Sequence, residues 1–588
     1  MAKWMLKQTT ADIDAITRQT GVSPVLARIL AVRGYRDPGS ASAFLDSYKA
    51  DLSDPLLLPD MERAAKITAH AVGNRLKIVV FGDYDADGVM STVILCTTLK
   101  SLDADISYYI PSREGEGYGL NKPAISQLAD EGTNLIITCD NGIASADEIA
   151  FAHSLGLQVI VLDHHAIPCD GTKEIIPDAE AVVDAKRGDC QYPYREYCGA
   201  GICYRFSEAL FRMIQRDWSY LKEYCLPFVT IATICDIVDL TGDNRQIVKL
   251  GLPGIKDCRQ IGMRALIHAA GLDNRDISTY HIGFILGPCI NAAGRLETAG
   301  IAVELFLTDD ELHAKQLAER LVSLNIARRT LTDDGVSLAY QLIESREFLN
   351  DKVIVLYSEK FSESVAGVIA GKIKERYNRP TIVLAGDGKV VHGSCRSIEA
   401  YNIFEGLGSC SDLLIGFGGH PMAAGLTIDR DRISDFRSAI NSRCGLTEED
   451  FQKVYRIDCP LLPEAASLDL AKELEKLEPY GKENPAPLFA CKNMFLQRVS
   501  LMGKDNKIMR LFFADSKGHR YEAMDFSNKD QLQEYIVNGF GLKCWLELLM
   551  GKCSNSISLD FIYTLGINLY NGREEAQIKI VDFRAGNI

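Results

Sequence analysis

Three short apolar runs constrain the fold of this 588-residue chain more than any other feature of its sequence. They cover residues 77–81, 134–138 and 158–162, and each is rich in β-branched side chains. A continuous apolar run, unlike an alternating one, is typical of a strand that is buried on both faces of a parallel sheet. The segments between the runs are long enough for crossover helices. We therefore predict a doubly wound α/β domain from residue 51 to about residue 200.

Acidic and imidazole side chains follow each run directly. Asp83, Asp85 and Asp87 follow the first run, Asp140 the second, and Asp163, His164 and His165 the third. Ligands of open parallel sheets bind outside the carboxyl ends of the strands, so these groups converge if the three strands are neighbours. Such carboxylates raise one another's pKa, and divalent cations are their natural compensation. Aspartates with one or two histidines suit Mn²⁺ or Mg²⁺, and Asp140 could bridge two ions, as in enzymes that hydrolyse phosphate esters.

Two other interpretations of these residues are weaker. The Asp-x-Asp-x-Asp-Gly run at 83–88 resembles the start of a calcium loop. However, Ile94 stands where that loop needs a glutamate, and an apolar strand precedes the run instead of a helix. A purely structural role is the other interpretation, because histidine pairs near strand ends are often structural. The conjunction of three acidic strand ends favours a metal site over both.

The rest of the chain divides by its residue pattern. Leucines at helical spacing predict a long helix over 306–345, and a second α/β block follows it. The C-terminal region shows short alternating segments and a hairpin signal at Asn571-Gly572, which predict a small β-barrel or sandwich. Residues 1–50 are expected to form short helices.

Charge, cysteine content and hydropathy limit the function classes. The net charge of −15 excludes a basic coat over the whole protein, although one local basic groove can still bind nucleic acid. Lys372, Lys374, Arg376 and Arg379 could line such a groove or form a solvated helix face. No Cys-x-x-Cys pair occurs among the 17 cysteines, so the usual signature of a zinc ribbon or a thioredoxin is missing. No apolar run is long enough for a membrane span and no signal peptide occurs, so we expect a cytoplasmic protein.

Several segments resemble the motifs of the DHH phosphoesterase family. Four successive family motifs are similar to FGDYDADGVMST (81–92), TCDNG (138–142), DHH (163–165) and CDIVDL (235–240). GSCRS (393–397) and GFGGHPMAAG (416–425) resemble the DHH-associated domain that follows. Within this family the chain resembles the RecJ exonucleases, which degrade single-stranded DNA from the 5′ end. That resemblance rests on REGEGYGL (113–120), CGAG (198–201), GPCINAAGRL (287–296), LEPYGKENPAPLF (477–489), INLYNG (567–572) and QIKIVDF (577–583).

The resemblance covers nearly the whole chain in collinear order and implies its architecture. It implies an N-terminal helical segment (1–50), a parallel-sheet DHH catalytic domain (51–305), a connecting helix (306–345), a smaller α/β DHH-associated substrate-binding domain (346–450) and an OB-fold nucleic-acid-binding β-barrel (451–588).

The resemblance also implies roles for single residues. Asp85, Asp87, Asp140, His164 and Asp236 match metal-ligand positions, while Asp83, Asp163 and His165 match positions behind the ligands or against the phosphate. Arg113, Ser394 and Arg396 match positions that hold the 5′-terminal phosphate, and Tyr118 matches one that packs against the terminal nucleotide. Asn291, Arg295 and His420 match positions near the scissile phosphate, and Gly418 and Gly419 complete the substrate-binding set. We expect His165 and Arg295 to take part in catalysis.

The substrate-binding residues also have structural interpretations. Arg113 and Arg396 could form surface salt bridges, and Asn291 could cap a helix. Gly418 and Gly419 could have no role other than to form a tight turn. His420 lies in a glycine-rich segment, where a core position is less expected.

The chain departs from the usual RecJ pattern at three places. Phe361-Ser362 replaces a common Trp-His pair, Cys289 replaces an arginine, and Cys395 replaces a small residue. The metal-ligand positions show no departure. We therefore expect intact chemistry and a partly rebuilt DNA groove.

The sequence thus predicts a two-metal, Mn²⁺- or Mg²⁺-dependent exonuclease. It would hydrolyse single-stranded DNA from the 5′ end to 5′-mononucleotides, in DNA repair and recombination, as a monomer with a helicase and a single-strand-binding protein as candidate partners. One alternative is a DHH phosphodiesterase for short or cyclic oligonucleotides, although such relatives usually lack an OB-like tail. The second alternative is a catalytically inactive DNA-binding subunit, against which the intact metal-ligand positions argue.

Overall fold

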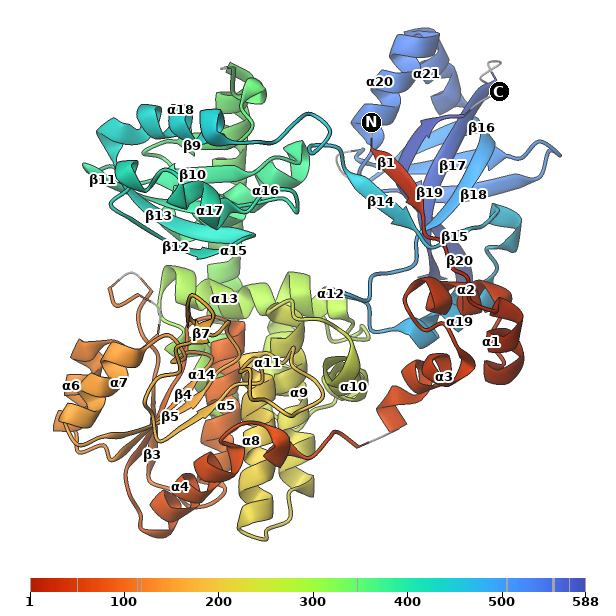
Figure 1. Ribbon diagram of the computed structural model, residues 1–588. Coiled ribbons are helices and arrows are strands. Elements are labelled where there is room, and N and C mark those ends of the chain that lie inside the picture. Colours follow the sequence, from red (N-terminus) through yellow and green to blue (C-terminus); the bar gives the residue numbers. More distant parts are fainter. Residues whose placement is uncertain are drawn as a thin grey trace. The chain divides into compact units, whose positions relative to one another are not determined.

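The computed structural model describes residues 2–49, 51–113, 115–117, 119–345, 347–503, 506–552, 556–570 and 572–586. The chain forms two compact units. The larger unit is Asp51–Phe451, and the terminal unit combines Met1–Ala50 with Gln452–Ile588, the red and blue ends of the chain in Figure 1. No helix within the described ranges is both long and apolar enough to cross a membrane.

A five-stranded parallel sheet underlies the first part of the larger unit. In order of pairing, its strands are β3 (Ile106–Tyr109), β2 (Ile78–Phe81), β4 (Leu135–Cys139), β5 (Gln158–Leu162) and β8 (Ala181–Val183). One face packs against α4 (Met61–Gly73), α5 (Ala86–Lys100) and α8 (Gly199–Met213), and the other against α6 (Lys122–Asp130) and α7 (Ala146–Ser154). Ile78 and Val80 point into the first core, whereas Val79 and Phe81 point into the second. Both faces are covered, as the continuous apolar runs predict.

A group of helices leads from this sheet into the predicted long helix. They are α9 (Ser219–Cys235), α10 (Gly242–Gly251), α11 (Ile261–Ala269), α12 (Thr279–His281), the π-helix η4 (Ile282–Leu286), α13 (Gly287–Leu296), α14 (Gly300–Leu307) and α15 (Glu311–Ser345). The long helix begins at Glu311 because α14 ends at Leu307 and Asp310 caps α15. The Asp310 carboxylate accepts hydrogen bonds from the N–H groups of Leu312 (2.8 Å) and His313 (3.1 Å).

A second five-stranded sheet follows α15. Its strands, in order of pairing, are β12 (Gly416–His420), β13 (Ala423–Asp429), β11 (Val390–Arg396), β10 (Thr381–Ala385) and β9 (Ile354–Tyr357). Only β9 and β10 pair in parallel. α16 (Ala366–Tyr377) and α15 share one core with this sheet, and α17 (Ile403–Gly408) and α18 (Ile433–Arg443) share the other. Gly418–Gly419 therefore lies in an edge strand, so the tight-turn interpretation was wrong.

A closed β-barrel forms the core of the terminal unit. Its strands are β16 (Phe489–Met502), β17 (Ile508–Ala514), β18 (Arg520–Asp525), β20 (Arg573–Ala585) and β19 (Ile557–Tyr570). The barrel closes because β16 pairs with β17 on one side and with β19 on the other. This closure decides between the barrel and the sandwich that the sequence left open. Asn571 of the predicted hairpin turn lies outside the described residues, and Gly572 follows it with a φ of 75°.

The N-terminal segment packs onto this barrel. It contains β1 (Lys3–Leu6), α1 (Ile13–Thr20), α2 (Pro24–Val32) and α3 (Pro38–Asp46). β1 pairs in parallel with β14 (Val454–Ile457), beside which it is drawn in Figure 1. Leu26 and Leu30 share one core with Phe489 of the barrel. The short helices were expected, but their place in the same compact unit as the C-terminal barrel was not.

Candidate metal centre and the adjacent basic cavity

The carboxyl ends of β2, β4 and β5 bring the predicted acidic and imidazole groups together. Donor atoms within 4.8 Å of one another form three groups: Asp83, Asp85 and Asp140; Asp87, His164 and Asp236; Asp140, Asp163, His164 and His165. The groups share Asp140 and His164, whose Oδ1 and Nε2 atoms lie 3.0 Å apart. Nε2 of His164 also lies 3.7 Å from Oδ2 of Asp87 and 3.8 Å from Oδ2 of Asp236. The donors therefore form one continuous cluster.

Backbone amides hold the aspartates of the first motif. Asp85 is the N-cap of α5, and its Oδ1 accepts hydrogen bonds from two N–H groups of the first turn (2.9 and 3.1 Å). Asp87 is buried and accepts hydrogen bonds from the N–H groups of Gly199 (2.6 Å) and Ala200 (2.8 Å) at the start of α8. A Cβ at position 199 would lie 2.7 Å from Cβ of Asp140, so glycine lets α8 begin this close to the cluster.

Asp163 organises the loop after β5. Its Oδ1 accepts hydrogen bonds from the N–H groups of His164 (2.7 Å) and His165 (3.2 Å) and lies 2.8 Å from Nδ1 of His165. Its Oδ2 accepts a hydrogen bond from the N–H of Ile143 (2.9 Å). Both oxygens are thus engaged in orienting the ring of His165 and the loop, as expected of a group behind metal ligands.

Asp236 reaches the cluster from a helix rather than from a strand. It caps the C-terminal end of α9, and the following Ile237 has a φ of 57° and is 68% exposed, so the chain turns away at once. The local sequence pattern does not identify Asp236 as a ligand, because an apolar helix precedes it. Only the family resemblance identified it. The usable signal was an acidic residue at the end of a long apolar helix.

Burial and like charges raise the pKa values of the clustered carboxylates. The pKa of Asp87 rises to about 6 through burial and the charge of Asp85, and that of Asp236 rises to about 8 through burial and the charge of Asp87. Burial is also the main cause that raises the pKa of Asp140 well above its usual range. Burial and the neighbouring His165 lower the pKa of His164 to about 3, so its imidazole is neutral. Carboxylates this close cannot all ionise unless a cation joins them.

The donor set fits divalent cations of the Mn²⁺ and Mg²⁺ class. Oδ1 of Asp83 is buried without a hydrogen-bond partner among the described residues, and Nε2 of His164 forms no well-aligned hydrogen bond although Oδ1 of Asp140 lies 3.0 Å away. A bound ion would satisfy both buried atoms. The donors are carboxylate oxygens and imidazoles without a thiolate, the combination that suits Mn²⁺ and Mg²⁺ better than a sulfur-rich zinc site does. The five residues that the family resemblance assigns to the ions all belong to these groups: Asp85, Asp87, Asp140, His164 and Asp236.

A basic cavity of about 620 Å³ lies in the same unit. Its lining residues are Arg113, Arg295, Ser362, Glu363, Ser364, Ala366, His392, Gly393 and Ser394. Nη1 of Arg295 donates a hydrogen bond to the carbonyl of Ser364 (3.0 Å), which links α13 to the segment before α16. Arg396 is not one of the lining residues but lies close to one of them: a Cβ at position 367 would lie 3.0 Å from Nη2 of Arg396 and 3.5 Å from Oγ of Ser394.

The arginines of this cavity are not paired with carboxylates in the described part of the chain. Arg295 and Arg396 donate to backbone carbonyls, and the guanidinium of Arg113 lies 5.5 Å from the centre of the Tyr84 ring. Burial, with the charges of Arg113, Arg328 and Arg396, lowers the pKa of Arg295 to about 10. Burial lowers the pKa of Arg396 as well. The salt-bridge interpretation of Arg113 and Arg396 therefore fails among these residues.

The cavity and the metal centre are neighbours. Tyr84, under the Arg113 guanidinium, stands between Asp83 and Asp85 in the chain, and the charge of Asp85 acts on Arg295. Asn291 of α13 accepts a hydrogen bond from the N–H of Ala86 (2.7 Å). Asn291 thus caps α5, a helix far from it in sequence, beside the metal-ligand positions.

The remaining predicted contacts divide into three groups. Tyr118 lies outside the described residues. Gly418, Gly419 and His420 are exposed on β12 and are not among the residues that line the cavity. Ser362 lines the cavity, whereas Phe361, its partner in the departure from the RecJ pattern, is buried in the core beside α15 and α16.

The basic run after β9 is engaged with the protein itself. Lys372 pairs with Asp333 (3.0 Å), and the guanidinium of Arg376 lies 4.2 Å from the centre of the Tyr340 ring. Arg379 lies in the same way over Phe451 (4.3 Å). These contacts favour the helix-face interpretation over a DNA groove.

The fold and the site together define a phosphoesterase of the DHH class. Three family models match in chain order: the DHH family N-terminal domain at residues 77–233, the DHHA1 domain at 350–445 and the RecJ OB domain at 457–582. The first contains the metal centre's strands, the second contains the sheet that borders the basic cavity, and the third contains the barrel.

The chain belongs to the RecJ family. It is 34% identical over 585 residues to the single-stranded-DNA-specific exonuclease RecJ of Bacillus subtilis, covering 99% of this chain and 70% of the relative. It is 32% identical over 597 residues to the protein of the same name from Salmonella typhimurium, covering 97% of each. The crystal structure of RecJ with Mn²⁺ from Thermus thermophilus matches with a TM-score of 0.81 and 26% identity, over all of this chain and 80% of that one.

Proposed function

We propose that this chain hydrolyses single-stranded DNA from its 5′ end and releases 5′-mononucleotides. One observation carries the proposal: a cluster of carboxylates suited to divalent cations lies directly beside a cavity whose arginines have no carboxylate partner among the described residues. A DNA end presents both complementary groups, because its phosphates are anionic and bind metal ions and guanidinium forks alike.

The cavity accounts for the choice of the 5′ end. In this proposal Arg113, Ser394 and Arg396 hold the terminal phosphate, with Tyr118 against the first nucleotide. Anchoring the end at a fixed distance from the acidic cluster would place the same phosphodiester bond there in every cycle. Mononucleotides would then be the products.

The protein's own groups provide part of the catalysis. At Asp85, Asp87, Asp140, His164 and Asp236, divalent ions would contribute stabilisation of charge on the phosphate and activation of water. Arg295 would stabilise negative charge that develops on the same phosphate, since its guanidinium is fixed by Ser364. Burial lowers the pKa of His165, but the hydrogen bond to Asp163 and the charges of nearby carboxylates together raise it to about 9, so this ring stays protonated at neutral pH. It can therefore donate a proton or a hydrogen bond beside the metal centre.

The proposal also includes the cellular setting. The chain would work in the cytoplasm as a monomer, in DNA repair and recombination, with a helicase and a single-strand-binding protein as further partners. The matched OB domain supports single-stranded DNA as the nucleic-acid partner. Size-exclusion chromatography and co-purification from cells test the monomer and the protein partners.

An end-label assay tests the main proposal. Single strands labelled at the 5′ or the 3′ end, a blunt duplex, a dinucleotide and a cyclic dinucleotide are incubated with Mn²⁺ and with the wild type, Asp85→Ala or Asp184→Asn. We expect mononucleotides from the 5′ end of single strands with the wild type and Asp184→Asn, and none with Asp85→Ala. Asp184 is the matched control because it is a buried acid after β8 that belongs to none of the donor groups. Cleavage confined to the dinucleotide or the cyclic dinucleotide would contradict the proposal.

A further inference from the structure

An exposed aromatic pair stands on the helix that precedes α13. The rings of Tyr280 and Phe284 are stacked, with centroids 5.0 Å apart and planes inclined by 26°. The two residues are 60% and 63% exposed, although large apolar side chains usually contribute to a core. Phe284 lies in the π-helix η4, and π-helical turns occur frequently at functional sites. The pair therefore requires an explanation other than folding.

The pair lies on a segment that packs close to the metal centre. The η4 segment packs against the last turn of α9, because a Cβ at position 283 would lie 3.8 Å from Ile234 and one at position 287 would overlap the sulfur of Cys235. Asp236 follows Cys235 directly. In the other direction η4 continues into α13, which carries Asn291 and Arg295.

Two arginines of α15 accompany the pair. Nη2 of Arg329 donates to the carbonyl of Phe284 (3.4 Å). The neighbouring Arg328 donates from Nε (3.1 Å) and Nη2 (2.9 Å) to Oδ1 of Asn325, which in turn donates to the sulfur of Cys289 (3.4 Å). Neither arginine forms an ion pair with a carboxylate in the described ranges. The charge of Arg328 also acts on Arg295, so cationic groups continue from the basic cavity towards the aromatic pair.

We infer that Tyr280, Phe284 and Arg329 form a subsite for unpaired nucleotides of the DNA strand that extends from the metal centre. Bases stack on the exposed rings, and the guanidinium of Arg329 binds a phosphate. This inference rests on the proposed function and deepens it. A π-face is available only on a base that is not enclosed in a duplex, and neither group reads base edges, so the subsite favours single strands of any sequence.

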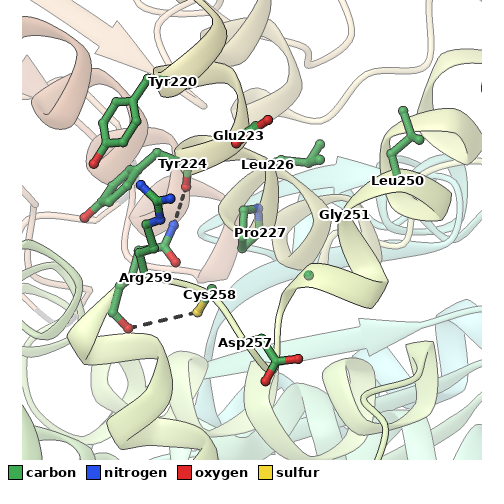
Figure 2. A pocket seen from close by; sticks show the side chains of 12 residues that line it. Tyr220, Glu223, Tyr224, Leu226, Pro227, Leu250, Gly251, Asp257, Cys258 and Arg259 are labelled. Carbon is green, nitrogen blue, oxygen red and sulfur yellow. Dashed lines mark hydrogen bonds between the residues drawn. The ribbon is translucent and has the colours of Figure 1, made fainter.

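A second aromatic pair, with one exposed and one half-buried ring, provides an internal comparison. Tyr220 and Tyr224 lie at the start of α9, with centroids 6.1 Å apart, and the guanidinium of Arg259 lies 5.9 Å from the Tyr220 ring centre. Figure 2 shows this pair with Glu223 and Asp257 in the same pocket, where two carboxylates disfavour phosphate. Tyr220 is 59% exposed, and nearly the whole length of the 17-residue helix α9, at about 1.5 Å per residue, separates it from Asp236. Tyr220→Ala is therefore a matched control for Phe284→Ala.

Binding measurements test the subsite. Anisotropy of a labelled, 5′-phosphorylated oligothymidylate is measured in an Asp85→Ala background, which blocks cleavage. We expect Phe284→Ala and Tyr280→Ala each to weaken binding roughly tenfold, as loss of one base–aromatic stack does. Tyr220→Ala should bind like its parent, and Phe284→Trp should restore binding because it keeps a π-face. Arg329→Gln should lower the salt-dependence slope by about one.

Cleavage assays locate the stacked base. Strands with one abasic nucleotide at successive positions should show one position where the abasic site raises KM for the wild type but not for Phe284→Ala. Phe284→Ala should also raise KM more for a long strand than for a dinucleotide, whereas a folding defect would affect both. Equal losses with Tyr220→Ala and Phe284→Ala, or unaltered binding with both Phe284→Ala and Tyr280→Ala, would overturn the inference. Release of mononucleotides by the wild type tests the proposed function separately.

Discussion

The metal centre and the basic cavity carry opposite charges, yet both concentrate side chains of one charge sign in a small volume. In the metal centre carboxylates outnumber the protonated His165, and in the basic cavity the arginines form no ion pair with a carboxylate among the described residues. In the metal centre the pKa of Asp140 is therefore raised well above its usual range, and in the basic cavity the pKa of Arg295 is lowered to about 10. Placing like charges close together lowers the free energy of unfolding, and a bound ligand of opposite charge raises it again. In the proposed function the metal centre is therefore the acidic half, and the basic cavity the basic half, of one site for a metal-bound phosphate.

Charged groups with a structural role in the same unit are treated differently. Arg187 forms ion pairs with Asp60 (2.7 Å) and Asp189 (2.7 Å), and the buried Arg205 is paired with Glu208. Breaking such pairs destabilises a protein because it leaves an uncompensated charge. Clusters in which side chains of one charge sign predominate therefore distinguish the ligand sites of this protein from its structural ion pairs.

The largest expected effect is the loss of a single ligand from the acidic half. Asp236→Ala should lower kcat/KM for mononucleotide release roughly 10³-fold, since it removes a donor for an ion that stabilises charge on the phosphate. Steady-state kinetics with Mn²⁺ measure it. The neighbouring Ile237→Ala is the control, because that exposed side chain lies outside the donor groups. Activity within tenfold of the wild type would remove Asp236 from the metal centre.

Metal binding should stabilise the acidic half and leave the basic half untouched. At a Mn²⁺ concentration one hundred times its Kd, the free energy of unfolding should rise by about 2.7 kcal/mol. Chelation with EDTA should abolish this gain. Thermal unfolding of His164→Ala should show little response to Mn²⁺, whereas Arg396→Gln should respond like the wild type. A full response of His164→Ala would show that the ions bind elsewhere.

In the basic half, Arg396 should determine the preference for a phosphorylated end. Arg396→Gln should lower kcat/KM on 5′-phosphorylated strands about 10- to 100-fold, the usual worth of a hydrogen bond to a charged group. On the same strands with a 5′-hydroxyl, the substitution should lower kcat/KM much less. Arg376→Gln is the control, because that arginine packs on Tyr340 instead of lining the cavity. Equal losses on both kinds of end would mean that Arg396 does not hold the terminal phosphate.

The acidic half and the basic half also differ in how much of each can be predicted from the sequence. The acidic half follows from strand periodicity, because three apolar runs place their acids at the same edge of a parallel sheet. Asp236 escapes this reasoning since it ends a helix. The basic half joins Arg113, Arg295 and Arg396 from loops, helices and strands far apart in the chain, a conjunction that only the family resemblance indicated.

The same limit applies to the fold. The sheet, the long helix and the barrel each have a local period, and these elements were predicted. The pairing of β1 with β14 joins Lys3 to Val454, and no local pattern specifies a partner at such a distance. Similarly, closure of the barrel depends on β16 pairing with β19, which alternation within either strand cannot determine.

The smallest effect concerns Asp184, a buried acid at the same sheet edge that joins none of the donor groups. Its Oδ1 accepts a hydrogen bond from the N–H of Lys186 (2.7 Å), while its buried Oδ2 has no partner among the described residues. Burial and the charge of Asp163 raise its pKa to about 8. The unfolded chain ionises this carboxyl near pH 4, so its contribution to stability declines as the pH rises from about 4 to about 8.

Asp184→Asn removes this titration and keeps an oxygen for Lys186. The difference in unfolding free energy between the variant and the wild type should therefore grow from pH 5 to about pH 8, by up to about 1.4 kcal/mol per pH unit, and then level off. Urea unfolding in EDTA measures it without a contribution from bound metal. If the two proteins keep a constant difference across this range, the carboxyl is compensated in the folded state, and Asp184 resembles the paired structural charges such as Arg187.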